Sequence, residues 1–109
     1  MKVKWFVEAS GDLDQIYDYY LKKNNRVAAL LYNKILDEVE LLKTHPYIGS
    51  IEKLLADCSE GYRSLVVANG KYKVIYFILK ETVFIVQVFD CRRNPNNLMK
   101  STLIRKGTV

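Results

Sequence analysis

The sequence predicts an α+β fold in which a helical hairpin packs on one face of an antiparallel sheet. Two observations carry this prediction. Between residues 62 and 89, three short runs rich in β-branched and aromatic side chains follow one another, separated by polar turns, which is typical of consecutive strands. Ahead of them, two stretches with apolar residues at helical spacing are joined by a short polar link. The expected order is strand, helix, helix, strand, strand, strand.

The first expected element is a strand at residues 2–7. Its residues alternate in character, with Val3, Trp5 and Val7 on one side of the chain. A period of two indicates a strand. It must join the later sheet, because a lone strand has no pairing partner.

The first helix is expected to open at Ser10-Gly11-Asp12. Asp12 with Gln15 three residues later resembles a capping box, and Ser10 is the alternative cap. Asp12, Asp14 and Asp18 are interpreted as a solvated face near the helix N-terminus. The apolar stripe follows helical spacing and contains Leu13, Ile16, Tyr17, Tyr20 and Leu21.

The second helix is expected over residues 26–44, and His45-Pro46 ends it because a residue before proline avoids the helical region. Leu30, Leu36 and Leu41 widen its apolar stripe, so the helix is expected to touch both the first helix and the sheet. The stripe itself contains Ala28, Leu31, Tyr32, Ile35, Val39 and Leu42.

A connector at residues 47–60 leads to the sheet and is expected to pack through one helical turn. Asn69-Gly70 is the strongest hairpin signal in the chain, because both residues tolerate positive φ angles. The three strands of the predicted meander span residues 62–68, 71–79 and 83–89. The other face of the sheet is left open to solvent or to a partner.

At 109 residues, the chain is expected to form a single domain over residues 1–109, with a basic tail from about residue 98. No run approaches the roughly 18 apolar residues of a membrane span, and the start lacks an apolar signal core. We therefore expect a cytoplasmic protein with no membrane partner. The single histidine and the two widely separated cysteines predict neither a metal site nor a cofactor.

Positive charge is concentrated in the second half of the sequence. Residues 61–109 contain nine Lys and Arg against two Asp and Glu, a net charge of +7, while the whole chain carries +5. Such an imbalance favours an anionic partner, either a nucleic acid or an acidic protein segment.

The candidate functional residues form a basic set of Arg63, Lys73, Arg92 and Arg93. In an up-down-up meander, the end of the third strand lies beside the start of the second, so Arg92 and Arg93 are expected near Lys73. Arg63 starts the first strand, and it joins them only if the strands are short or strongly twisted. The set is interpreted either as a site for phosphate or carboxylate groups, or as charge that protects a sheet edge.

Four segments in this order resemble the RelE/ParE superfamily of toxins from bacterial type II toxin–antitoxin modules, which includes plasmid stabilisation proteins. They are ASGDLDQIYDYY at residues 9–20, LLKTHPYIG at 41–49, YKVIY at 72–76 and VFDCRRNP at 88–95. The resemblance extends to about Leu98 and implies a RelE/ParE-like fold. Lys73 stands where the family usually has Arg, and Asp90 stands where many ParE-type members have His.

The resemblance implies a ParE-like toxin that inhibits growth by binding DNA gyrase and is neutralised by a cognate antitoxin, with no cofactor. Two alternatives stay open: a RelE-like mRNA endonuclease that acts on the ribosome, and a non-toxic binding module of the same fold. Leu65 occupies the place of a second RelE-type lysine, and no tyrosine follows Tyr76. RNA cleavage needs a general base and acid, and arginine is a poor proton shuttle, so the ParE-like interpretation is favoured.

Overall fold

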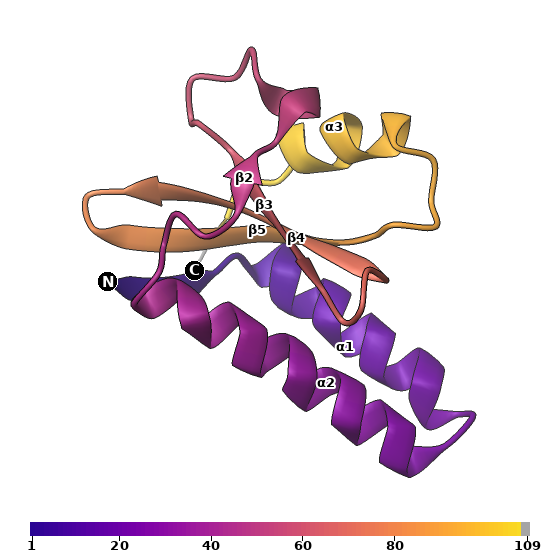
Figure 1. Cartoon of the computed structure of the whole chain (residues 1–109). Helices are drawn as coiled ribbons and strands as arrows, with labels where there is room; N and C mark the ends of the chain where they lie inside the picture. Colours follow the sequence, from indigo (N-terminus) through magenta and orange to yellow (C-terminus); the bar gives the residue numbers. More distant parts are fainter. Residues whose placement is uncertain (108–109) are drawn as a thin grey trace.

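The computed structural model describes residues 1–107 of the chain, and its α+β architecture confirms the predicted fold class (Figure 1). Helices α1 and α2 form the predicted hairpin, and β3, β4 and β5 form the predicted meander. The elements are β1 (Lys2–Trp5), α1 (Val7–Leu21), α2 (Asn25–Glu40), the 3₁₀ turn η1 (Leu41–Lys43), β2 (Ser50–Ile51), the 3₁₀ turn η2 (Lys53–Leu55), β3 (Arg63–Val67), β4 (Tyr72–Leu79), β5 (Thr82–Asp90) and α3 (Asn96–Leu103).

The five strands form one sheet in the order β1-β5-β4-β3-β2. The pairings of β2 with β3, β3 with β4 and β4 with β5 are antiparallel. The exception is β1, which runs parallel to β5 with Lys2 opposite Thr82 and Trp5 opposite Ile85. The expectation of a wholly antiparallel sheet was therefore wrong. Alternation of side chains identifies a strand but carries no information on which strand it pairs with, or in which direction.

Helix α1 begins at Val7, one turn before the predicted start. Phe6 occupies the N-cap position without a side-chain cap, and the amide of Ser10 donates to the carbonyl of Phe6 within the first turn. Ser10 and Asp12 are therefore inside the helix, and the predicted capping box was wrong. The strand β1 ends correspondingly earlier, at Trp5.

Helix α2 is capped by Asn24, whose side chain accepts hydrogen bonds from the amides of Arg26 and Val27 at 2.9 and 3.1 Å. The central residues of its predicted stripe are buried, including Ile35 and Val39. Leu30 and Leu41 were expected to be buried as well, but 61% and 47% of their surfaces are exposed. They lie on the opposite side of the helix.

Two cores flank the sheet, which lies between the helical hairpin on one side and α3 on the other (Figure 1). The larger lies between the sheet and the helical hairpin and includes Leu13, Ile35 and Tyr76. The smaller lies on the other face, where Leu55 of η2 and Leu98 of α3 pack with strand residues. The face expected to be open is thus partly covered, and the basic tail expected from about residue 98 begins inside helix α3 (Asn96–Leu103).

A β-bulge bends β5 where β1 ends. Ile75 of β4 pairs with Gln87 and Tyr76 pairs with Ile85, so Val86 is the extra residue. Within the described chain, β1 pairs with β5 only as far as Ile85. The outer edge of β5 from Val86 onward therefore has no neighbouring strand, and it faces α1.

The connector before β2 is fastened to the sheet by Tyr76. Its hydroxyl donates to the carbonyl of Pro46 at 2.8 Å and accepts from the amide of Gly49 at 3.0 Å. A Cβ atom at position 49 would lie 2.6 Å from both the carbonyl oxygen of Ser64 and the Tyr76 hydroxyl, so only glycine allows this approach.

Removing this hydroxyl with Tyr76→Phe is expected to lower the free energy of unfolding by about 1–3 kcal/mol, because two polar backbone groups lose their partner while the ring stays in place. Urea denaturation measures the change. Tyr19→Phe is the matched control, because 51% of Tyr19 is exposed. Equal stability of the two variants would contradict the role given to Tyr76.

Candidate functional site

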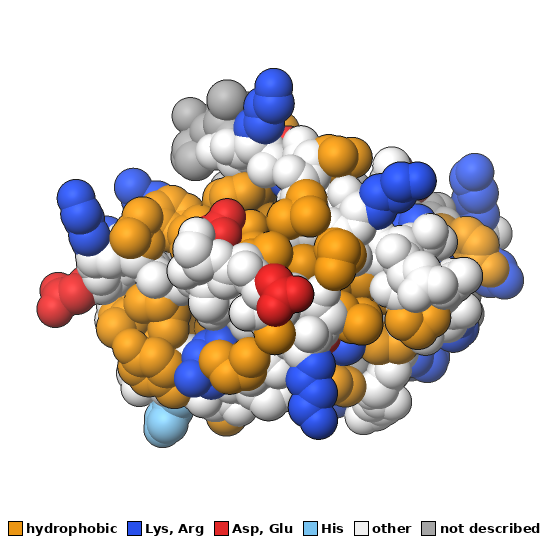
Figure 2. All heavy atoms as spheres, turned by 90° about the horizontal axis from the view of Figure 1, so that it is seen from above, with side chains coloured by type: hydrophobic (Ala, Val, Ile, Leu, Met, Phe, Trp, Pro, Cys, Tyr) orange, Lys and Arg blue, Asp and Glu red, His pale blue; other side chains and the backbone are white. Residues whose placement is uncertain are grey.

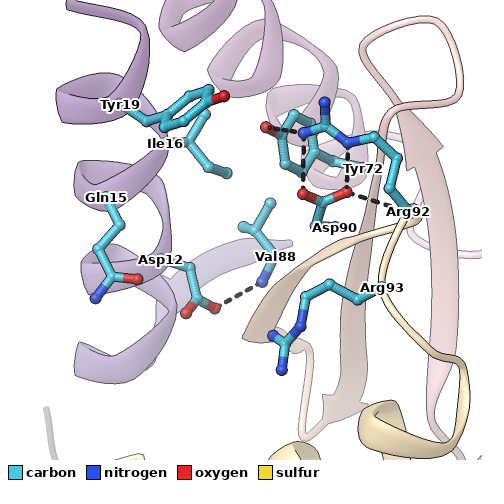
Figure 3. Close-up of a pocket in the computed structure, with 9 residues that line it drawn as sticks. All are labelled: Asp12, Gln15, Ile16, Tyr19, Tyr72, Val88, Asp90, Arg92 and Arg93. Atoms are coloured by element: carbon cyan, nitrogen blue, oxygen red, sulfur yellow. Dashed lines mark hydrogen bonds and ion pairs between the residues drawn. The ribbon is translucent and has the colours of Figure 1, made fainter. Parts of the chain in front are cut away.

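A cleft of about 410 Å³ lies between α1 and the free edge of β5 (Figure 3). One wall is contributed by α1, and the other by the end of β5 and the turn that follows it. The lining residues are Asp12, Gln15, Ile16, Tyr19, Tyr72, Val88, Asp90, Arg92 and Arg93. Two of the four predicted site residues, Arg92 and Arg93, are among them.

Asp12 closes the floor of this cleft. Its carboxylate accepts from the amide of Val88 at 2.9 Å and from two guanidinium nitrogens of Arg105 at 2.6 and 2.9 Å. Arg105 also donates to the carbonyl of Val86 at 2.9 Å. The pair thus satisfies polar groups on the free edge of β5, and the interpretation of Asp12 as part of a solvated face was wrong.

Arg92 is held by a carboxylate of its own chain. Its guanidinium donates to both oxygens of Asp90 at 2.9 Å and to the hydroxyl of Tyr72 at 3.2 Å (Figure 3). The hydrogen bonds from Arg92 outweigh the effect of burial and lower the pKa of Asp90 below its ordinary value. Asp90 therefore stays ionised and neutralises the charge of Arg92.

Two tyrosines join this arrangement. A hydrogen bond from Tyr72, together with Arg92, lowers the pKa of the Tyr20 phenol on α1. Burial and the neighbouring Tyr20 raise the pKa of Tyr72. Tyr20 of α1 therefore lies within the electrostatic influence of Tyr72 and Arg92 at the end of the sheet.

Arg93 is the remaining cation of the cleft. Its guanidinium lies 5.5 Å from the centre of the Phe89 ring, and within residues 1–107 it forms no salt bridge. An exposed guanidinium without a carboxylate partner is available to an external anion.

Lys73 lies elsewhere, on the opposite face of the sheet. Its ammonium group donates to Glu52 at 2.8 Å, and the same carboxylate accepts from the amide of Leu54 at 3.1 Å. Burial tends to raise the pKa of Glu52, but these hydrogen bonds outweigh it and the pKa is lowered. Lys73 therefore anchors the connector to the sheet.

Arg63 is likewise engaged in the fold. It donates to the carbonyl of Gly49 and lies 5.0 Å from the centre of the Tyr47 ring. In the sheet register it faces Tyr76, whereas Asp90 faces Tyr72, so about 13 Å of strand separates Arg63 from the cleft. Arg92 and Arg93 thus line the cleft, whereas Arg63 lies farther along the sheet. Lys73 is at the same end of the sheet as expected, but its side chain points to the opposite face.

The surface seen from above the sheet likewise shows basic side chains that lie apart from one another (Figure 2). Lys and Arg side chains are spread around its rim, and hydrophobic side chains gather between them (Figure 2). On this face, the positive charge is dispersed rather than collected in one patch (Figure 2).

Two further features are absent from residues 1–107. No group of three or more His, Cys, Asp or Glu side chains is placed to hold a metal ion there. No helix in that part of the chain is long and apolar enough to cross a membrane.

Comparison with known protein families decides the identity of this fold. Residues 3–95 match the family model described as the ParE toxin of the type II toxin–antitoxin system parDE. The chain belongs to the ParE toxin family. The match includes the helical hairpin, the sheet from Val3 onward and the turn that carries Arg92 and Arg93, while α3 and Arg105 lie beyond it.

Solved structures agree on the fold. A chain described as the chromosomal ParDE system from P. aeruginosa superimposes with a TM-score of 0.69 and 21% sequence identity, over 83% of this chain and 95% of that one. No curated protein matches the sequence significantly. ParE membership thus rests on the family model, and the solved structure supports the RelE/ParE-like fold.

Sequence reasoning missed the residues that shape the cleft of this ParE toxin. Asp12 and Arg105 are 93 positions apart, and nothing in their local context distinguishes them from surface charges. A signal did exist for Asp90, because a carboxylate two residues before an arginine after a strand allows a local ion pair.

Proposed function

We propose that this ParE-family chain inhibits growth by binding DNA gyrase and is neutralised by a cognate antitoxin that occupies the cleft between α1 and β5. The observation that carries the proposal is the composition of this cleft. Ile16 and Tyr19 offer apolar and aromatic surface beside Arg93, which is free to pair with an acidic group. Such a combination suits recognition of a protein segment.

The same residues favour binding over catalysis. Stabilising the charge of a cleaved phosphate requires cations that are free to meet it. Arg63, Lys73 and Arg92 each have a hydrogen-bond or carboxylate partner, whereas Arg93 forms no salt bridge within residues 1–107. We therefore favour a toxin that acts through protein contact in the cytoplasm.

Growth experiments test toxicity directly. Induced alone in a bacterium, the protein is expected to slow growth, and co-expression of its antitoxin is expected to restore it. Cells should filament and show DNA damage, and the purified protein should inhibit supercoiling by gyrase. Normal growth with soluble protein present would leave the third alternative, a non-toxic module of this fold.

One observation supports the RelE-like alternative. Tyr72 and Arg92 lower the pKa of the Tyr20 phenol, and a tyrosine hydroxyl beside a guanidinium belongs to the groups that can transfer protons in RNA cleavage. If this alternative holds, translation stops first and messages are cut in phase with codons on the ribosome. Such cleavage with unaffected gyrase would reverse the order of the two proposals.

Binding of the antitoxin should depend on salt mainly through its association rate. An acidic, amphipathic segment would be attracted by net positive charge, while apolar contacts in the cleft would hold it. Raising the NaCl concentration from about 0.05 to about 0.5 M shortens the screening length to a few ångströms and should slow association strongly. Surface plasmon resonance measures both rates, and a change confined to dissociation would contradict this division.

A further inference from the structure

A second apolar surface lies on the solvent side of α2, away from the cleft. Leu30 and Leu41 are 61% and 47% exposed there, and Lys34 and Asp37 lie between them. These side chains border a shallow groove together with Asn33 and Glu38. No residue of the cleft takes part in it.

The four residues form one stripe along α2, which Leu41 continues as the first residue of η1. Leu30, Lys34, Asp37 and Leu41 are spaced by four, three and four positions, which places them on one face for three turns. Ile35 and Val39 project from the opposite face into the core. The stripe is therefore a helix-pairing surface that residues 1–107 leave exposed.

The charges within the stripe have no partner inside the described chain. Across residues 1–107, neither Lys34 nor Asp37 takes part in a salt bridge or a side-chain hydrogen bond. The neighbouring Glu38 does, because it accepts from the amide of Ala68 at 2.9 Å and fastens the helix to the sheet. Lys34 and Asp37 remain available to an external partner.

The order of the four residues is complementary to itself. When two copies of α2 are paired antiparallel about a point between Ile35 and Leu36, position 30 faces position 41 and position 34 faces position 37. Leu30 then meets Leu41 of the partner subunit, and Lys34 meets Asp37 of the partner subunit. A parallel pairing would set Lys34 against Lys34 of the partner subunit, so the charges select the antiparallel arrangement.

We propose that this chain forms a homodimer through the exposed face of α2. Two symmetric Lys34–Asp37 ion pairs lie at its centre, with one leucine contact on each side of them. Such a two-fold arrangement uses the same patch on both subunits. One face of one helix buries less than the roughly 1,200 Å² of standard interfaces, so the dimer is weak and reversible. Both clefts stay accessible in it.

Sedimentation velocity of the full chain, from about 10 µM to about 1 mM, tests the proposal in the concentration range of a weak dimer. The wild type is expected to move from monomer towards dimer as concentration rises. Lys34→Asp and Asp37→Lys each replace two attractive pairs by two repulsive ones and should raise the dissociation constant at least about tenfold. Lys100→Asp in α3 is the control and should leave it unchanged.

Mixing provides the sharper test. Lys34→Asp carries acidic groups at both positions and Asp37→Lys carries basic groups at both, so the two variants should associate with each other although neither pairs with itself. The double variant Lys34→Asp/Asp37→Lys should dimerise like the wild type. Circular dichroism confirms that each variant is folded. A wild type that stays monomeric throughout, or a mixture of variants that does not associate, would overturn the proposal. Either result is also expected if a helix of another protein, and not a second copy of this chain, covers this face.

Discussion

Replacing Asp12 by alanine is expected to lower the free energy of unfolding by about 3–5 kcal/mol, the largest effect of a single substitution that we expect on stability. The carboxylate is only 17% exposed and binds both the guanidinium of Arg105 and the amide of Val88. Its removal leaves a partly buried cation and an amide on the free edge of β5 without a partner. Urea denaturation followed by circular dichroism measures the change.

Asp14→Ala is the matched control, because this exposed carboxylate lies on the same helix and is expected to contribute less than about 0.5 kcal/mol. Arg105→Met tests the other half of the pair, and combining it with Asp12→Ala should cost less than the sum of the two single changes. Additive effects would show that Asp12 and Arg105 stabilise the protein independently. Equal stability of the Asp12→Ala and Asp14→Ala variants would contradict the structural role of the pair.

Reversing the charge of Arg93 is expected to abolish growth inhibition and to slow association with the antitoxin, while the protein stays folded. Arg93 is exposed, lines the cleft and forms no salt bridge within residues 1–107. Arg93→Glu therefore changes the charge presented to a partner without breaking an internal ion pair. Colony counts after induction and binding kinetics with the antitoxin measure the two effects.

Two comparisons make the result specific to the cleft. Lys100→Glu changes net charge by the same amount on α3, outside the residues that line the cleft, and should leave toxicity intact. The double change Arg92→Glu with Arg93→Glu should also abolish toxicity, but Arg92→Glu breaks the pair with Asp90 and sets two carboxylates together. A folded Arg93→Glu protein with full toxicity would remove Arg93 from the functional site and favour edge protection.

The elements of this fold were largely predictable because their signals are local. The Asn69-Gly70 turn and the runs on either side of it predict the β3–β4 hairpin. Both turn residues do have positive φ angles. The stripes of α1 and α2 gave the helical hairpin through their spacing. The motifs also pointed to the correct superfamily, since they depend on the same short segments.

The candidate site was predictable only in part, because it depends on contacts between distant positions. The prediction placed Arg92 and Arg93 together at the end of the third meander strand, which the structure confirms. It also grouped them with Lys73 and Arg63, which face other partners. Their functional role stays a prediction.

The sequence by itself determined which segments are strands and helices, because backbone propensity and side-chain spacing act over a few residues. Only the tertiary structure decided where β1 pairs, and which charges are neutralised inside the fold. Asp12 meets Val88 across 76 positions and Arg105 across 93. A carboxylate on a helix looks the same in sequence whether it faces water or a strand edge, and its partner is set by how the layers pack.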